Sequence, residues 1–181
     1  MTRGIAFGLL LILVAAPHAV ADVESERFLR AVAPLDEPRG LCVDIPGHRD
    51  RVNVSAALVV HTCKWDIWNL DERFDAPAFA RGELRMPSFD LCAGVNGHQT
   101  GSVIRLGACD GSAPRQWIID EGRVRSAAAP DMCLTIGAEP STLTPGGRRL
   151  PSRHVARSLA LAECQSPADD RQRWELVSPQ R

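Results

Sequence analysis

The chain of 181 residues carries 21 basic and 22 acidic side chains, which leaves a formal net charge of −1. A charge this close to zero excludes attraction to nucleic acid or to an anionic membrane through bulk charge. Rings make up 5% of the residues and none is a tyrosine, so a surface that stacks on unpaired bases is also excluded. Lys64 is the only lysine, and all other basic residues are arginines.

The first 21 residues have the pattern of a secretory signal peptide. Arg3 supplies a positive charge, an apolar run follows, and Ala19 and Ala21 frame a cleavage site. The apolar run is shorter than the ~20 residues that cross a bilayer. We therefore expect cleavage near Ala21 and a soluble protein, secreted or periplasmic, with no membrane span. What remains fits one domain with a sizeable core.

Residues 22–38 form a lead-in to a unit that occurs three times, at approximately 39–81, 82–121 and 122–181. We call these units lobes one, two and three. Each holds an apolar residue with a cysteine, a nearby glycine, a variable stretch, an apolar strand with a second cysteine, and then a ring. The starts read LCVDIPG, LCAGVNG and MCLTIG, and the strands read ALVVHTC, VIRLGAC and LALAEC.

Six cysteines in an exported chain indicate disulfides, and the repeats select one pairing from the many that six cysteines allow. Equivalent cysteines pair within each lobe. The predicted disulfides are Cys42–Cys63, Cys92–Cys109 and Cys133–Cys164.

A ring follows each second cysteine after a polar loop, at Phe74, Trp117 and Trp174. Short runs of Val, Ile and Leu lie between Gly, Pro, Asp and Asn, and no stretch after the leader sustains a helical period. A threefold unit of short strands predicts an all-β fold, a β-trefoil with pseudo-threefold repeats and three intra-repeat disulfides.

The longest irregular stretch, residues 139–157, enlarges lobe three, and we expect it to be an exposed loop. It carries four arginines, Arg148, Arg149, Arg153 and Arg157, against the single acid Glu139.

Two motifs in register with the cysteine pairs resemble those of the ricin B-type lectin trefoils. They are Q-x-W, ending at Trp174, and its variant R-x-W, ending at Trp117. The resemblance covers nearly all of the mature chain. It implies that the ring packs in the core while the glutamine fixes a turn. Arg115 and Glu72 replace that glutamine in lobes two and one, so two of the turns are atypical.

The resemblance also implies a shallow sugar pocket in each lobe. Its parts are an aspartate two residues after the first cysteine, a ring two before the second, and an asparagine before the Q-x-W. Neither lobe two nor lobe three retains them. The residues at these places are Gly94, Gly107 and Pro114 in lobe two, and Thr135, Ala162 and Arg171 in lobe three.

Lobe one retains an acceptor, a flat ring and a further polar group, at Asp44, His61 and Asp71, with Glu72 beside them. The resemblance makes these four residues the candidate carbohydrate site. Other roles stay open. The Asp44 side chain can hydrogen-bond to the backbone of its own turn, and His61 can be a structural histidine at the edge of the core. Trp65 or Trp68, in the following loop, is an alternative platform for the sugar ring.

The residues favour a binding module over an enzyme. Asp44 and Asp71 could form a carboxylate pair for glycoside hydrolysis, but the chain has no metalloprotease, nucleophile-elbow or phosphate-loop motif. We expect no catalysis, no cofactor and no resident metal, with calcium as a minor alternative should the two aspartates meet. The expected partner is a glycan or glycoconjugate.

The alternative is a trefoil that binds a protein partner instead of sugar, through residues 139–157. Toxin-delivery subunits and protease inhibitors of trefoil fold are the analogies.

Overall fold

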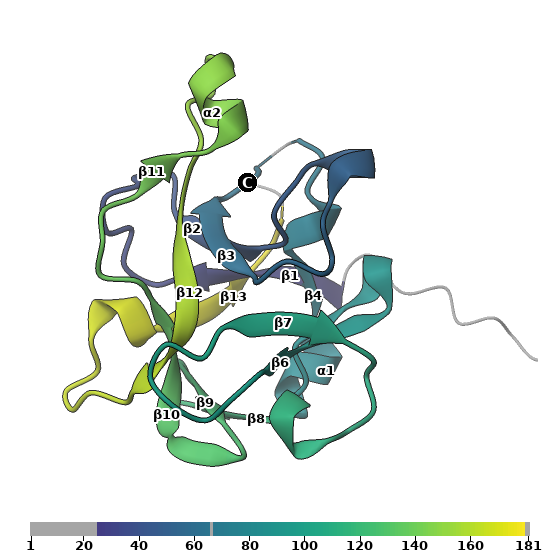
Figure 1. Cartoon of the computed structure of the whole chain (residues 1–181), viewed down its shortest axis with the longest axis vertical. Coiled ribbons are helices and arrows are strands. Elements are labelled where there is room, and N and C mark those ends of the chain that lie inside the picture. Colours follow the sequence, from purple (N-terminus) through teal and green to yellow (C-terminus); the bar gives the residue numbers. More distant parts are fainter. Residues whose placement is uncertain (1–24, 66, 180–181) are drawn as a thin grey trace, which may run out of the picture.

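The computed structural model describes residues 25–65 and 67–179, so the predicted signal peptide and its cleavage site lie outside the described residues. The regular secondary structure of these residues is mainly β (Figure 1). The strand β1 (Glu26–Ala31) precedes lobe one, which holds β2 (Leu41–Asp44), β3 (Val59–Thr62) and β4 (Arg73–Asp75), with the helix α1 (Ala76–Ala80) after them. Lobe two holds β5 (Arg85–Met86), β6 (Leu91–Val95), β7 (Ile104–Gly107) and β8 (Trp117–Asp120). Lobe three holds β9 (Arg123–Ser126), β10 (Ala129–Ile136), β11 (Thr142–Leu143), α2 (Pro145–Arg149), β12 (Val155–Glu163) and β13 (Trp174–Val177).

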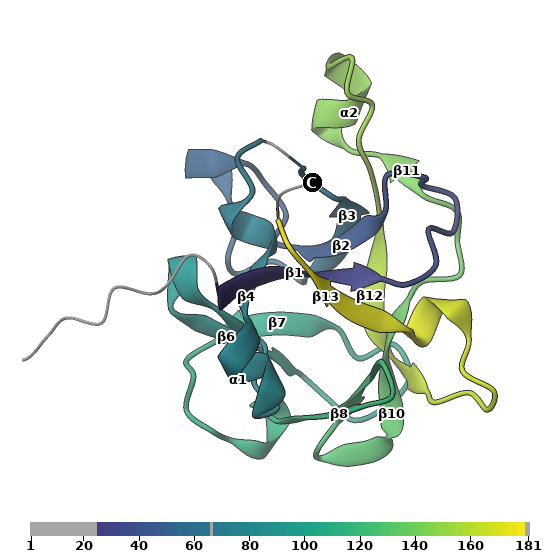
Figure 2. The ribbon, with the colours of Figure 1, turned by 180° about the vertical axis from the view of Figure 1, so that it is seen from behind.

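The strands pair antiparallel in the pseudo-threefold arrangement of a β-trefoil. One sheet runs in the order β13-β1-β2-β3-β12-β10-β9-β8, and β5-β6-β7 form a second, smaller sheet. Single bridges, Ala57 with Arg105 and Val103 with Ala160, tie lobe two to its neighbours. The chain closes where β1 meets β13, as Figure 2 shows from behind. The predicted all-β trefoil is confirmed.

The first strand lies inside the segment 22–38 that the sequence suggests is only a lead-in. Buried and half-buried residues alternate along most of β1, from Glu26 to Ala31. This strand pairs with β13, β2 and β4. The segment is therefore part of the trefoil from Glu26 onward, because an unpaired β13 would expose its backbone polar groups.

The rings at Phe74, Trp117 and Trp174 are at most 4% exposed and belong to one apolar core. Each indole N–H donates to the carbonyl of the residue that follows the first cysteine of its lobe. Trp117 reaches Ala93 at 3.0 Å, and Trp174 reaches Leu134 at 3.0 Å. The ring and that strand are thereby fixed to one another in two of the three lobes.

The three disulfides join the pairs that the repeats predict, each with a Cα–Cα separation of 5.0 Å. Disulfides of this kind are typical of oxidising compartments. Among the described residues, no helix is long and apolar enough to cross a membrane.

Residues 139–157 are more ordered than the exposed loop that we expect from the sequence. They contain β11, α2 and the first residues of β12, and they project beside lobe one (Figure 1). Thr144 caps α2 by accepting from the backbone N–H of Gly147 at 2.9 Å. A Pro follows that cap at the first helical position, which favours a helix start.

Replacing Trp174 by alanine should lower the free energy of unfolding by about 3 to 5 kcal/mol, because a large buried ring is lost. Replacing it by phenylalanine retains an aromatic ring but leaves the Leu134 carbonyl without its donor, so this change should cost about 1 to 3 kcal/mol. Urea unfolding of the two variants measures the difference. An alanine variant that unfolds at the wild-type midpoint would show that the ring is not part of the core.

Candidate functional site

A buried ammonium holds two carboxylates together in lobe one. The Nζ of Lys64 lies 2.9 Å from Oδ1 of Asp44 and 2.6 Å from Oδ2 of Asp71. All three residues are at most 3% exposed. Sequence analysis predicts that Asp44 and Asp71 belong to one site, and the structure brings them to the same cation.

Local structure fixes each member of this cluster. Asp44 ends β2, and Lys64 follows Cys63 just after β3, so the Cys42–Cys63 disulfide holds their two strands at this level. Asp71 lies in a single 3-10 turn, Leu70–Glu72, whose backbone meets the end of β2 through a hydrogen bond from Ile45 N–H to the Asp71 carbonyl (3.1 Å). The three charged groups therefore converge through two strand ends and one turn.

Glu72 takes the structural place that Gln172 takes in lobe three. Its Oε2 accepts from the backbone N–H of Lys64 at 2.8 Å, just as Oε1 of Gln172 accepts from that of Gln165 at 2.9 Å. The amide of Gln172 also donates, to the Thr135 hydroxyl (3.0 Å) and to a carbonyl of β12 (2.8 Å). The remaining Glu72 oxygen, Oε1, is buried and has no hydrogen-bond partner among the described residues. Protonation of Glu72 would keep this unpartnered oxygen from carrying a buried charge.

The charge balance supports that protonation. Three buried carboxyl groups face one ammonium, so full ionisation would leave uncompensated buried charge. Burial raises the pKa of Glu72 well above its usual range, and the Asp71 charge adds to this, although Lys64 opposes it. Burial likewise raises the pKa of Asp44, against the pull of Lys64. For Lys64, burial lowers the pKa, but the surrounding carboxylates outweigh it and the pKa is raised.

His61 lies beside this cluster, on β3. Its Nδ1 is 2.7 Å from the Thr62 carbonyl and 3.5 Å from Oε1 of Glu72. Its ring meets that of His154 edge to face, with centroids 5.1 Å apart. Burial lowers the pKa of His61, and burial followed by the His61 charge lowers that of His154 to about 4. Both imidazoles are therefore neutral at neutral pH.

Asp44, His61 and Glu72 could also hold a metal ion, since they offer ligand atoms within 4.8 Å of one another. The Lys64 ammonium already contacts Asp44, and His61 Nδ1 is engaged with the Thr62 carbonyl. A cation would have to compete with both interactions.

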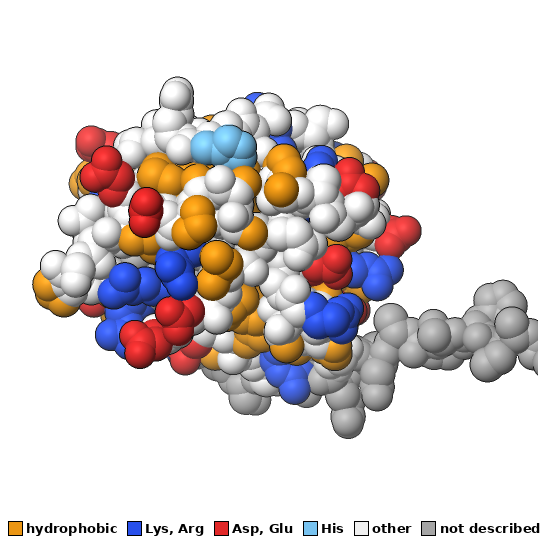
Figure 3. All heavy atoms as spheres, turned by 90° about the horizontal axis from the view of Figure 1, so that it is seen from below, with side chains coloured by type: hydrophobic (Ala, Val, Ile, Leu, Met, Phe, Trp, Pro, Cys, Tyr) orange, Lys and Arg blue, Asp and Glu red, His pale blue; other side chains and the backbone are white. Residues whose placement is uncertain are grey.

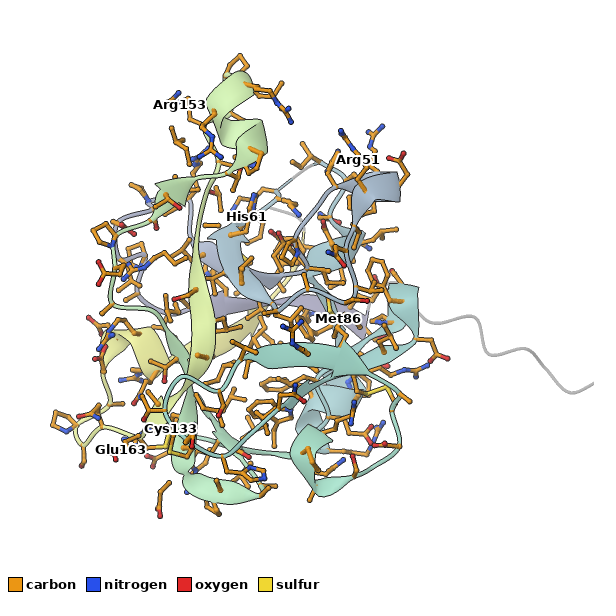
Figure 4. All side chains as sticks on the ribbon, viewed as in Figure 1. Arg51, His61, Met86, Cys133, Arg153 and Glu163 are labelled. Carbon is orange, nitrogen blue, oxygen red and sulfur yellow. A yellow bond between two sulfur atoms is a disulfide. The ribbon has the colours of Figure 1, made fainter. Side chains whose placement is uncertain are left out.

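A hollow of about 1100 Å³ opens above the cluster. Asp44, His61 and Lys64 line its floor. One side is the 3-10 turn Arg49–Arg51 with the loop after β3, and the other is the α2 projection of lobe three. In Figure 4, His61 lies between Arg51 on the first side and Arg153 on the second.

Two of the four predicted site residues line this hollow, and two do not. Asp44 and His61 line it, whereas Asp71 and Glu72 are fully buried and do not line it. Trp68, one of the two alternative platforms, lines the hollow and stands edge to face with His48 at 5.2 Å.

Trp65, the other alternative platform, also lines the hollow, but its ring is committed elsewhere. It packs on Phe28 at 5.2 Å and donates from its indole N–H to the Arg39 carbonyl at 2.9 Å.

The equivalent place in lobe two is filled. The Arg115 side chain lies over Gly94 and Gly107, so that a Cβ on either glycine would collide with it. These are the positions that correspond to Asp44 and His61. In lobe two an arginine therefore takes the volume that lobe one leaves for its polar floor.

The equivalent place in lobe three is closed by internal hydrogen bonds. The Thr135 hydroxyl accepts from Gln172 and donates to the Cys133 carbonyl at 2.8 Å. Arg171 is paired with Asp169 at 2.6 Å. The hollow over lobe one keeps charged groups, Asp44 and Lys64, on its floor.

Sequence reasoning misses Lys64, because repeat comparison has no lysine at this place: Asp110 and Gln165 follow the second cysteine in the other lobes. The available signal is that the only lysine of an arginine-rich chain directly follows Cys63.

No protein-family model and no curated protein sequence matches the chain. Solved structures do match. A mutant C-terminal domain of an earthworm lectin, solved with 6'-sialyllactose, is 13% identical with a TM-score of 0.56, over 84% of this chain and 97% of that one. The β-trefoil lectin of Vibrio vulnificus hemolysin/cytolysin, solved with N-acetyl-D-lactosamine, is 13% identical with a TM-score of 0.56, over 84% of this chain and 93% of that one.

The agglutinin of Abrus precatorius is 17% identical with a TM-score of 0.58, over 92% of this chain and 52% of that one. The fold is that of the ricin B-type lectin trefoils. At these identities the similarity concerns the fold, and the residues of lobe one have to carry any argument about function.

Replacing Lys64 by methionine should destabilise this trefoil by about 3 to 5 kcal/mol at neutral pH, because Asp44 and Asp71 lose their counter-charge while they stay buried. Urea unfolding measures the loss. The double variant Lys64→Met, Asp71→Asn should recover part of it, since one of the two stranded charges is removed. A single variant with wild-type stability would contradict the buried ion cluster.

Replacing Glu72 by glutamine should make stability depend less on pH. The raised pKa of Glu72 means that its contribution is complete below its unfolded pKa of 4.5 and is lost as pH rises through the folded pKa. As pH rises above 4.5 the wild type should therefore lose stability relative to Glu72→Gln, as urea unfolding over a pH series would show. A variant that is less stable than wild type at about pH 8 would contradict a protonated Glu72.

Proposed function

We propose that the protein is a secreted or periplasmic carbohydrate-binding module with one ligand site, the lobe-one hollow. One observation carries this proposal. Lobe one keeps an open hollow above Asp44 and Lys64, whereas Arg115 fills the equivalent place in lobe two and Gln172 closes that in lobe three.

The floor offers the groups that a saccharide needs. A sugar presents adjacent hydroxyls, which donate and accept, together with a flatter apolar face. Lys64 has three N–H donors, and within the described residues two of them are used, by Asp44 and Asp71. The third is left for a ligand hydroxyl, and Asp44 can accept from a neighbouring one. His61 and Trp68 supply flat surfaces on the same hollow.

In this proposal the four predicted residues have different roles. Asp44 and His61 contact the ligand, together with Lys64. Asp71 and Glu72 position Lys64, one through the ammonium and the other through its backbone N–H. We infer that they form no glycosidase pair, because Asp71 does not line the hollow and hydrolysis needs two carboxyl groups that face the same bond.

The expected affinity follows from the size of the hollow and from the proposal of a single site. Its volume is at the upper end for sites that take drug-sized ligands, so more than one sugar unit fits. One open site of this kind supports a dissociation constant of about millimolar to high micromolar. Tighter attachment would need several copies of the protein or clustered glycans.

A protein partner at the same hollow is the second candidate. Ile67 and Leu150 line the hollow and are 49% and 58% exposed, and exposed apolar side chains on a rim suit a protein contact.

A glycan array followed by NMR titration of the hits tests the carbohydrate proposal. Asp44→Asn and His61→Ala should each weaken binding by roughly tenfold or more, because a carboxyl oxygen or a contact surface is lost. Trp68→Ala is a further variant that leaves the Lys64 cluster intact. Asp131→Asn, an exposed aspartate in lobe three, is the matched control and should bind as wild type.

Each variant must first melt as a folded protein. Absence of any saccharide binding at millimolar concentration would overturn the proposal and leave the protein-partner reading. Undiminished binding by folded Asp44→Asn and Trp68→Ala would overturn the assignment to lobe one.

A further inference from the structure

The two sides of the lobe-one hollow come from different repeats and are both anchored. Lobe three reaches lobe one because β12 pairs with β3, with Ala156 opposite His61. The Arg39 guanidinium donates to the carbonyl of Ser152 at 2.6 Å and to that of Arg153 at 3.3 Å. The α2 side is thus held against lobe one by the pairing of β12 with β3 and by the hydrogen bonds from Arg39.

Two further contacts fix the base and the tip of this projection. Asp36 accepts from the backbone N–H and the hydroxyl of Ser141, at 2.7 and 2.8 Å. At the tip, Gly147 is buried against the His154 backbone so closely that any Cβ would collide with it. The hollow therefore has preformed walls.

The rim of the hollow is basic. Five arginines line it: Arg39, Arg49, Arg51, Arg148 and Arg149. Asp44 is the single acidic residue among the described lining residues, and the Lys64 ammonium already contacts it.

Four of these arginines are exposed, and among the described residues only Arg39 forms an ion pair, with Glu37 at 2.7 Å. Within the described chain, no acidic side chain lies within ion-pair distance of Arg49, Arg51 or Arg149. Arg148 gives one N–H to the Leu143 carbonyl.

This positive charge is local. The whole chain carries a net charge of −1, and Asp50 offsets part of the charge of its neighbours Arg49 and Arg51. On the face opposite α2, acidic and basic side chains are interspersed around an apolar strip (Figure 3). The hollow is therefore a place where one sign of charge is gathered around a recess, which concentrates ligands of the opposite sign.

Guanidinium groups match carboxylate and sulfate groups, because their forked N–H donors bind two oxygens at once. Building on the proposed function, we propose that the lobe-one hollow selects acidic oligosaccharides. A sugar's hydroxyls meet Asp44 and Lys64 on the floor, and its carboxylate or sulfate lies on the arginine rim between Arg51 of one wall and Arg149 of the other. The floor recognises a saccharide, and the rim recognises its charge.

Matched ligand pairs test this selectivity on the full mature protein. Sialyllactose against lactose measures the carboxylate, and a heparin tetrasaccharide against its desulfated form measures the sulfate. Calorimetry or NMR titration at low and at physiological salt gives the affinities. In at least one pair the acidic member should bind roughly tenfold tighter or more, and the advantage should shrink as salt rises.

The double variant Arg51→Gln, Arg149→Gln should lose this advantage while it still binds the neutral member. Its control is Arg123→Gln, Arg173→Gln, which removes the same charge from lobe three and should keep the advantage. Arg51, Arg149 and Arg173 are exposed and Arg123 is half-buried, and melting curves of both double variants verify that they fold.

Equal affinity for acidic and neutral members would overturn the inference while leaving carbohydrate binding in place. An advantage that survives in the rim variant, or that disappears equally in the control, would overturn it as well, because bulk charge would then explain the preference. Failure of every saccharide, with binding of a polyglutamate probe through the same arginines, would overturn both proposals in favour of an acidic protein partner.

Discussion

The contact between the Lys64 ammonium and two buried aspartates decides the structure of lobe one. Removing such charges from water costs several kcal/mol for each ion, and only close pairing repays this. The pairing requires that β2, β3 and the turn at Glu72 converge, and the Cys42–Cys63 disulfide holds two of these elements. In the proposed site, the third ammonium donor binds a ligand hydroxyl. The packing of the lobe and the chemistry of its floor therefore depend on one cation.

The three lobes share a backbone and differ in how they satisfy one buried position. Gln172 satisfies it as a neutral group that both donates and accepts. Glu72 does so as a carboxyl group that has to take up a proton to donate, and Arg115 turns away to fill the space over Gly94. The surface above this position differs accordingly. It is closed above Gln172, it is a charged floor above Glu72, and it is a recess filled by the side chain at Arg115. The residue at the glutamine position of the motif thus differs between the lobe with the hollow and the two lobes whose equivalent places are filled or closed.

Periodic signals predicted the fold well, and the site only in part. Three repeats with paired cysteines and a following ring determine the trefoil, the disulfides and the buried positions of Phe74, Trp117 and Trp174, because these features recur at fixed spacing. Asp44 and His61 do line the hollow. Lys64 was missed because it has no counterpart in the other lobes, and a repeat comparison detects only what recurs. The strand within residues 22–38 was missed because two of its three partners, β13 and β4, are distant in sequence, and it pairs with the nearby β2 only at Arg30 and Cys42.

The insertion 139–157 shows why a repeat cannot be interpreted lobe by lobe. Its sequence indicates a loop of lobe three, but β12 pairs with β3, so that the insertion rises beside lobe one instead. The hollow then combines a floor from one repeat with a wall from another, and the two are separable. Changes on the exposed wall at Arg149 leave the Lys64 cluster untouched, whereas changes in the cluster put the fold itself at risk. Ligand preference can therefore vary at the rim without loss of the buried charge balance on which lobe one depends.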